Sequence, residues 1–460
     1  MNNYTRTQTE LSTVRKMPKR GKGKNKSATM SDRRFKAKLE ALQCHFTWYQ
    51  DPNESRLLRR KEKLEDIGTE AGNPWLGHIY NLRGFFEFKL GFTEDAQRLF
   101  QEAAETFSQI RHVDEGPWLV VNYGNMAWLH HHLGEQEESQ KYLSKVDDLI
   151  RRYPSPSPGQ HHPEVYAEKA WSLMKFGAVQ SLNAAECFEK AISMQPDRAE
   201  WNTSYVIGLA SSKKHQDIDS ELLEKIKLAK EQDAENLYLA AVYLTRLAKK
   251  GEKVEDEVRE LGRQILKNPV SSYSGIKPLL RVYSNHVSAD EAIDLAEEAL
   301  NKHPGQRYLK RCVALCYKWR IMFVREGRQR PGMIDRAISL HKEVISLYPN
   351  SSFVKKIDLA NMYAKSSNEK AKCEQIYQKL LRRDLEPAEK QLLYNKFANY
   401  LHYDKKDHQG SIQFHMRAAS IPAQSFYRDE SIRALTRIKD TTTWNRRAQD
   451  LEQFLAKLKL

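Results

Sequence analysis

Residues 184–196 read AAECFEKAISMQP, and the spacing of four of them indicates the fold. Ala184, Phe188, Ala191 and Pro196 follow one another in steps of 4, 3 and 5 residues, so the first three lie on one face of a helix that the proline ends. The same steps recur in two other stretches, at Ala292, Ala296, Ala299 and Pro304 and, without the proline, at Ala96, Phe100 and Ala103. Small residues at such positions let a second helix cross closely, so the stretch predicts the second helix of a repeated helix pair.

Helix-ending prolines extend this repeat along the chain. They fall at Pro196, Pro269, Pro304, Pro349 and Pro422, which are 73, 35, 45 and 73 residues apart. These distances are close to one or two lengths of the tetratricopeptide repeat, which is about 34 residues long. No alternation typical of strands persists, and one helix pair cannot bury its own apolar face, so pairs must stack. The chain is therefore predicted to be all-α, a tetratricopeptide-repeat superhelix (an α-solenoid) of about eight repeats with a basic, aromatic-lined central groove.

Charge and composition divide the 460 residues into four segments. Residues 1–30 carry eight Lys and Arg against one Glu and have no apolar periodicity, so they are predicted to be a disordered basic extension. Residues 31–270 are predicted to form the N-terminal and middle part of the array, which contains the pocket. Residues 271–440 are expected to form its C-terminal part, and residues 441–460 a C-terminal helix.

Composition argues against several classes of protein. No run approaches the roughly 20 apolar residues of a membrane span, and residues 1–16 hold no apolar run, so neither a membrane segment nor a signal peptide is expected. Five cysteines without a CxxC pair favour reduced thiols in the cytoplasm, with Cys312 and Cys316 as small buried side chains. The three histidines at 130–132 lack a second ligand cluster, and no nucleophile or phosphate-loop motif occurs. No metal, no cofactor and no enzyme activity are therefore predicted.

Three predicted first helices share an aromatic–basic pair, in RGFFEFKLG (83–91), MAWLHHHLG (126–134) and KAWSLMKFG (169–177). In each, a basic residue follows an aromatic one by four positions, and the pairs are Phe85 and Lys89, Trp128 and His132, and Trp171 and Lys175. Successive pairs are 43 residues apart, and a small residue precedes each aromatic one. Such pairs are predicted to face the concave side, where bases stack on rings and phosphates meet cations. The alternative is that the three aromatic residues are packing residues that fill a narrow superhelix.

Further basic residues are predicted to extend the groove into the second half of the chain. Lys277 and Arg281 lie four apart in SGIKPLLRVY (274–283), and Arg311 and Lys318 follow in the next first helix, with Lys365 at the matching position of a later one. With the net charge of +15 and a pI near 9.3, this stripe suggests an anionic partner, for which nucleic acid is the usual one. The alternative is ordinary solvated surface charge.

Several segments closely resemble the interferon-induced proteins with tetratricopeptide repeats. They include CHFTW (44–48), IYNLRGFFEFKLG (79–91), EKAWSLMKFG (168–177), ALCYKW (314–319) and DLANMYA (358–364). The resemblance runs from about residue 31 to the last repeat, leaves out the extension, and is that of a divergent, fish-type member. It implies a cytoplasmic antiviral effector of innate immunity. Such a protein holds single-stranded RNA by a 5′-triphosphate or an under-methylated cap and blocks its translation without catalysis.

The resemblance also implies roles for single residues. Trp171 and Lys175 stand where the family has the tryptophan and lysine of its RNA pocket, and Lys277 keeps the charge of a basic contact. Other pocket positions depart from the family: Arg311 and Cys312 replace a His-Gln pair, Ser181, Ser211 and Ser284 replace aromatic or arginine contacts, and Lys213 and Lys214 lie close enough to Ser211 to compensate. The departures leave the preferred 5′ end open.

Two other interpretations stay open at this point. The array could be a protein-interaction scaffold in antiviral signalling that takes an acidic peptide and binds little RNA. Oligomers with paralogues or with itself fit either case, and the repeat around Phe414–Pro422 is the expected surface. The basic extension also allows nonspecific attachment to RNA.

Overall fold

The computed structural model describes residues 30–49, 53–68, 73–176, 180–212, 220–324, 332–441 and 446–458. The chain forms two compact units. Unit 1 contains residues up to Leu64 and Thr69–Tyr205, and unit 2 contains Glu65–Gly68 and Val206–Leu460. No strand occurs in the described residues, and the all-α fold predicted from the sequence is confirmed. The predicted segment boundaries near residues 270 and 440 stay predictions, and residues 1–29 of the basic extension lie outside the described residues.

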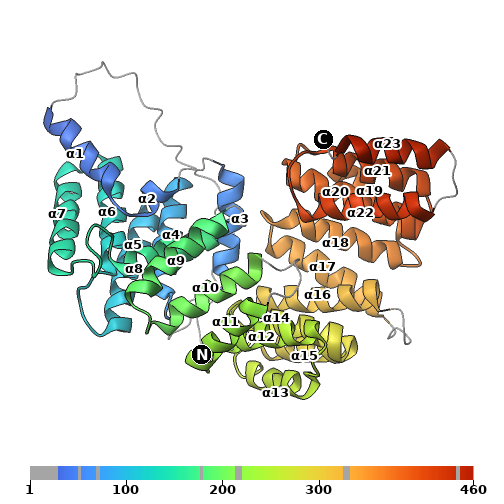
Figure 1. Ribbon diagram of the computed structural model, residues 1–460, viewed down its shortest axis with the longest axis horizontal. Helices are drawn as coiled ribbons and strands as arrows, with labels where there is room; N and C mark the ends of the chain where they lie inside the picture. The colour runs from blue at the N-terminus through green and yellow to red at the C-terminus, as the bar shows by residue number, and fades with distance from the viewer. Residues whose placement is uncertain are drawn as a thin grey trace, which may run out of the picture. The chain divides into compact units, whose positions relative to one another are not determined.

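Helix pairs follow one another along unit 1 (Figure 1). Its helices are α1 (Met30–Ala41), α2 (His45–Trp48), α3 (Glu54–Glu65), α4 (Leu76–Lys89), α5 (Thr93–Arg111), α6 (Leu119–Leu133), α7 (Gln136–Arg152), α8 (Pro163–Met174), α9 (Ser181–Met194) and the start of α10 (Ala199–Ser212). The most extensive packing joins α4 to α5, α6 to α7 and α8 to α9, and the first helices α4, α6 and α8 also contact one another. These are the three pairs that the aromatic–basic motifs predicted.

Unit 2 continues the array. After α10 it contains α11 (Ser220–Gln232), α12 (Leu237–Lys250), α13 (Glu255–Ile265), α14 (Ile276–Val282), the π-helical turn η2 (Tyr283–Val287), α15 (Ala289–Lys302), α16 (Arg307–Phe323), α17 (Met333–Leu347), α18 (Ser352–Lys365), α19 (Lys370–Leu381), α20 (Pro387–Tyr400), the π-helical turn η3 (Leu401–Lys405), α21 (His408–Ser420), α22 (Phe426–Thr441) and α23 (Arg446–Leu458). Helices α16 to α21 pack as three successive pairs. No helix in the described residues is long and apolar enough to cross a bilayer.

The residues that predicted the repeat perform the expected packing. Ala184, Phe188 and Ala191 are buried on α9, and their counterparts on α5 and α15 are buried as well. Gly84 shows how closely the helices approach, because a Cβ built on it would lie 2.8 Å from the ring of Phe100. Four of the five prolines stand two residues after a second helix ends, at Pro196, Pro304, Pro349 and Pro422. The proline therefore stops the helix at the same place in each of these repeats.

The cysteines lie where the sequence predicted them. Cys312 and Cys316 are buried on α16, and the described cysteines form no disulfide. Burial raises the pKa of the Cys312 thiol to about 11, so it stays protonated near neutral pH. These thiols are packing residues.

Candidate functional site

All three predicted aromatic–basic pairs form in unit 1. The Lys89 amine lies 5.5 Å from the ring centroid of Phe85, the His132 ring 5.5 Å from that of Trp128, and the Lys175 amine 4.2 Å from the ring of Trp171. A cation at such a distance from an aromatic face is attracted by the ring quadrupole. A separation of four residues thus brings each basic side chain close to its ring, while the predicted concave orientation of the pairs stays a prediction.

The aromatic members, however, do not line an open wall. Phe85 is fully buried and Trp128 is half-buried, because the short helix α2 packs against both. Phe46 of α2 lies 5.3 Å from Phe85 and stacks on Trp128 at 6.1 Å, while the indole Nε1 of Trp128 donates to the carbonyl of Leu39 (3.0 Å). Phe85 and Trp128 are therefore packing residues in this structure. Their predicted contact with RNA, and that of Lys89 and His132, stays a prediction.

Trp171 and Lys175 form a different environment at the end of α8. Trp171 is 1 % exposed and stacks on Trp75, with ring centroids 5.7 Å apart. Its buried Nε1 has no hydrogen-bond partner in the part of the chain that the structure describes. Lys175 follows the last helical residue, is half-buried, and burial lowers its pKa to about 7. A buried donor without a partner and a partly buried cation with a lowered pKa both favour an anionic or polar ligand.

An aromatic platform next to Lys175 was not predicted from the sequence. Tyr49 and Phe176 stack with ring centroids 3.8 Å apart, and the Arg60 guanidinium lies within 5 Å of both rings. Arg60 also donates to the carbonyl of Phe176 (3.4 Å), and burial lowers its pKa to about 10. Because Phe176 follows Lys175 directly, Arg60 adds a second cation to this end of α8. No sequence motif marks Arg60.

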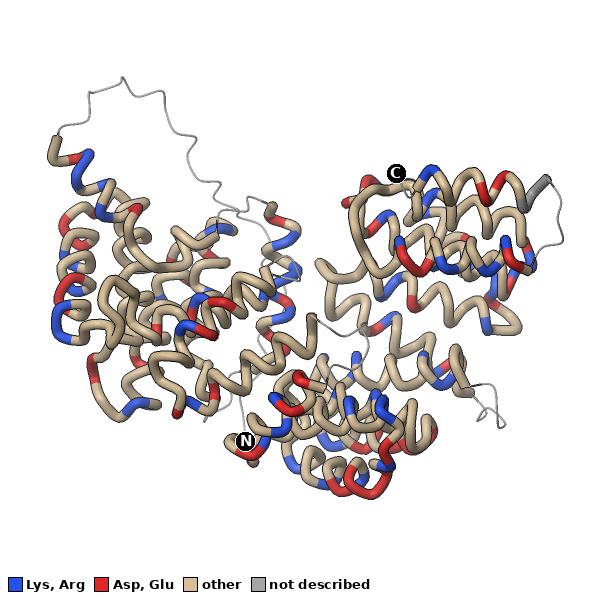
Figure 2. Tube along the Cα trace, in the orientation of Figure 1, with Lys and Arg blue, Asp and Glu red and all other residues tan. Residues whose placement is uncertain are grey.

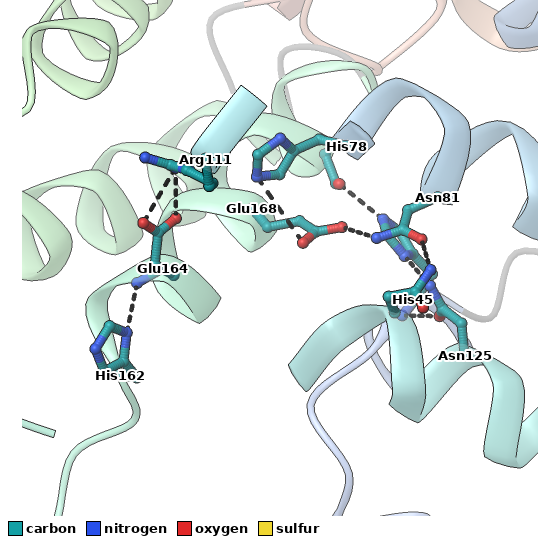
Figure 3. Close-up of polar contacts among 10 residues, drawn as sticks. His45, His78, Asn81, Arg111, Asn125, His162, Glu164 and Glu168 are labelled. Atoms are coloured by element: carbon teal, nitrogen blue, oxygen red, sulfur yellow. Dashed lines mark hydrogen bonds and ion pairs between the residues drawn. The ribbon is translucent and has the colours of Figure 1, made fainter. Parts of the chain in front are cut away.

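A buried polar network connects α2, α4, α6 and α8, the helix that precedes Lys175 (Figure 3). Its links are Asn122 Nδ2 to Asn81 Oδ1 (2.8 Å), Asn81 Nδ2 to Glu168 Oε1 (2.9 Å), the His45 backbone N–H to Asn125 Oδ1 (3.0 Å) and Asn125 Nδ2 to His45 Nδ1 (3.0 Å). Since His45 Nδ1 accepts, its neutral ring donates from Nε2 to Ser172 Oγ (2.9 Å). Glu168 and Ser172 flank Trp171 on α8, so the network holds the helix that carries the Trp171–Lys175 pair.

Burial keeps this network uncharged near neutral pH. It raises the pKa of Glu168 to about 8 and lowers that of His45 to about 3. His78, whose Nε2 lies 4.0 Å from Glu168 Oε2, also has a pKa well below its usual value because it is buried. Neutral groups in hydrogen-bonded contact avoid the large cost of burying charge. One turn earlier on the same face of α8, Glu164 is buried against the Arg111 and Arg198 guanidiniums.

The predicted basic stripe of unit 2 is largely a series of ion pairs. Arg311 contacts Asp66 at 3.2 Å, Lys318 contacts Asp358 at 2.8 Å, and Lys365 pairs with Asp404. Blue and red positions are accordingly interspersed along the helices in Figure 2. Lys and Arg side chains that are paired with carboxylates of the same chain attract an anionic ligand less strongly than a row of unpaired cations would.

The remaining predicted positions of unit 2 lie on α14 and η2. Lys277 is half-buried on α14, and Arg281 is exposed with its guanidinium 5.9 Å from the ring of Trp319. Ser284, in η2, has a buried hydroxyl without a hydrogen-bond partner among the described residues. Lys213 and Lys214 lie outside the described residues. No group of three or more His, Cys, Asp and Glu side chains in the described part of the chain could hold a metal ion.

Comparison with known proteins gives consistent matches over nearly the whole chain. Residues 75–146 match the family model of the tetratricopeptide repeat. The human antiviral innate immune response effector IFIT1 is 27 % identical over 452 residues, which cover 93 % of this chain and 91 % of that protein.

Solved structures of the same human protein give the corresponding match in three dimensions. The human IFIT1 dimer with m7Gppp-AAAA is 26 % identical, with a TM-score of 0.72 over 92 % of this chain and 96 % of that one. The human IFIT1 dimer with PPP-AAAA is 25 % identical, with a TM-score of 0.70 over 92 % and 95 % of the two chains.

Proposed function

The chain belongs to the interferon-induced proteins with tetratricopeptide repeats, and we propose that it is a cytoplasmic antiviral effector that binds single-stranded RNA by its 5′ end. A 5′-triphosphate or an under-methylated cap is the feature bound, and sequestration of this end blocks translation without catalysis. The solved structures of the human relative with m7Gppp-AAAA and with PPP-AAAA support this ligand class.

The single observation that carries the proposal is the Trp171–Lys175 pair. The lysine amine sits 4.2 Å from the indole ring, and its pKa is lowered to about 7 by burial. An anion that binds there favours the charged form of the lysine. Arg60, over the Tyr49–Phe176 platform, adds a guanidinium that matches phosphate oxygens in geometry.

The test is binding of the full chain to one short single-stranded RNA that carries a 5′-triphosphate, an under-methylated cap or a 5′-hydroxyl. We expect tight binding of one of the first two forms and at least a tenfold loss with Lys175→Glu, since a like charge then faces the phosphates. Lys141→Glu makes the same change of charge at an exposed position of α7 and should leave the affinity within about twofold.

The scaffold alternative is favoured by one observation, the internal ion pairs of unit 2, which reduce the charge available to RNA. It predicts equal and weak binding of all three RNAs, with no response to Lys175→Glu. That result would reject the proposed function, because the pair at the end of α8 would then have no role in recognising an end.

A further inference from the structure

A four-residue segment, Glu65–Gly68, is part of unit 2 although the residues on both sides of it belong to unit 1. The backbone of the segment is fixed by a hydrogen bond from the Ser272 N–H to the Asp66 carbonyl (2.7 Å) and by the Ser271 hydroxyl, which donates to the Ile67 carbonyl. Asp66 is thereby held in place among the helices of unit 2.

The Asp66 carboxylate occupies a cradle of cationic and hydroxyl donors. It accepts from Arg307 Nε (3.1 Å), from the Arg311 guanidinium (3.2 Å) and from the Tyr348 hydroxyl (2.7 Å), and its side chain is 3 % exposed. Arg307, Arg311 and Lys355 all lie within 6 Å of the Tyr348 ring centroid. Two guanidiniums thus contact the buried Asp66 carboxylate, Lys355 lies over the ring of Tyr348, and Glu65 pairs with Arg307 (2.9 Å).

This donor set is also what a phosphate group requires. Two guanidiniums and a phenol hydroxyl present several N–H and O–H donors to one point, which suits phosphate oxygens as well as carboxylate oxygens. Burial lowers the pKa of Arg311, but Asp66, together with Tyr348, Cys312 and Tyr308, outweighs this effect, and the pKa is raised on balance. Arg311, which the sequence predicted to contact RNA, therefore directs its donors at a carboxylate of its own chain.

We propose that Asp66 is an internal competitor that determines which anions the Arg307–Arg311–Tyr348 cradle accepts. An incoming phosphate must displace the carboxylate. A phosphodiester with one negative charge gains little by replacing another monoanion, whereas a terminal polyphosphate brings several charges and gains from the exchange. Asp66 thus reserves the cradle for polyphosphate ends, and as an account of RNA recognition this proposal rests on the proposed function.

The test measures binding of inorganic triphosphate, 5′-triphosphate RNA and 5′-hydroxyl RNA to the full chain. Asp66→Asn removes the charge, keeps an amide oxygen for the arginines, and should raise the affinity for inorganic triphosphate roughly tenfold, or about 1.4 kcal/mol. Arg311→Gln added to this variant should abolish the gain. For 5′-hydroxyl RNA the affinity should rise as well, because a phosphodiester no longer has to displace a carboxylate, and the preference of the full chain for a polyphosphate end should therefore narrow.

Glu297→Gln is the matched control. The Glu297 carboxylate accepts from the Arg336 guanidinium (3.0 Å) and from the Tyr317 hydroxyl (3.0 Å) in the same unit, so the variant makes the same change of charge at a similar donor set. It should leave all three affinities unchanged. An equal gain with Glu297→Gln, or no gain in triphosphate binding with Asp66→Asn, would show that Asp66 is only a structural ion pair.

Two further comparisons keep the proposal testable in every case. If Asp66→Asn does not fold, Arg311→Gln in the otherwise unchanged chain must weaken binding of inorganic triphosphate and leave 5′-hydroxyl RNA unaffected; any other result overturns the proposal. Failure of the proposed function looks different, because RNA binding would then not depend on Lys175 or on the 5′ end. The change that Asp66→Asn causes in the affinity for inorganic triphosphate would still decide whether the cradle binds anions in competition with Asp66.

Discussion

The buried carboxyl group of Glu168 should make the free energy of unfolding depend on pH, and a single substitution should remove this contribution. The side chain is 1 % exposed, accepts a hydrogen bond from Asn81 and has a pKa raised to about 8 by burial. Glu168→Gln keeps the shape and an acceptor oxygen for Asn81 but cannot ionise. The variant therefore reproduces the protonated carboxyl at every pH.

The sign and size of the effect follow from proton linkage. In the unfolded chain the carboxyl loses its proton near pH 4.5, whereas in the folded chain it keeps it to about pH 8. Between these values the folded state binds more protons, so the free energy of unfolding decreases as the pH rises, by roughly 1 kcal/mol per pH unit. Relative to the wild type, Glu168→Gln should be equally stable near pH 4.5 and more stable by a few kcal/mol at pH 8.

The assay is urea unfolding of the wild type and the variant between pH 4.5 and 8.5, with the difference between the two compared at each pH. Other titrating groups act on both proteins and cancel in this difference. Glu137→Gln, at an exposed position of α7, is the control and should show a difference near zero throughout. A constant difference for Glu168→Gln, or a wild type that gains stability over the variant as the pH rises, would show that the buried carboxyl is charged and would refute this reasoning.

Three further outcomes follow from the geometry of unit 1. Because burial lowers the pKa of Lys175 to about 7, anion binding above pH 7 requires proton uptake, so RNA affinity measured by fluorescence anisotropy should fall by up to roughly tenfold per pH unit there, and Lys175→Arg should flatten the profile. Trp128→Phe removes the hydrogen bond to the Leu39 carbonyl and should cost about 1 kcal/mol, seen as faster hydrogen exchange in α1 with RNA affinity unchanged. Gly84→Ala places a Cβ 2.8 Å from the Phe100 ring and should lower the free energy of unfolding in urea by about 1–3 kcal/mol.

The fold could be predicted from the sequence because its determinants are local. Ala184, Phe188 and Ala191 share a helical face, and Pro196 stops the chain from continuing the helix two residues after Met194. Nothing beyond the repeat itself is needed to see that such pairs must stack. The aromatic–basic pairs formed for the same reason, since a separation of four residues brings side chains together on any helix.

The environment of these pairs depends on segments that are far apart in the sequence. The spacing of residues within one helix cannot predict such contacts. The four residues of α2 are too short for a periodic signal, yet Phe46 covers Phe85 and Trp128. Asn81 and Glu168 are 87 residues apart, and in the sequence each is a polar residue on a largely apolar helix, with nothing to indicate that the two form a hydrogen bond. A polar residue at a position that the helical period assigns to the core was the available signal, because such a group needs a partner when it is buried.

The net charge of the chain proves a poor guide to where an anion binds. Residues 1–30 carry eight of the basic residues against one acid. Within unit 2, cations such as Arg311 and Lys318 are held by Asp66 and Asp358, so they stabilise the stacking of helices and contribute little field to solvent. A binding site is distinguished instead by buried polar or charged groups whose desolvation free energy a bound ligand can offset. Lys175 has its pKa lowered to about 7 beside a buried indole N–H, and a phosphate or cap placed there would recover part of the desolvation cost that folding imposes on the lysine. A test of function should therefore begin with Lys175 rather than with the sum of the charges.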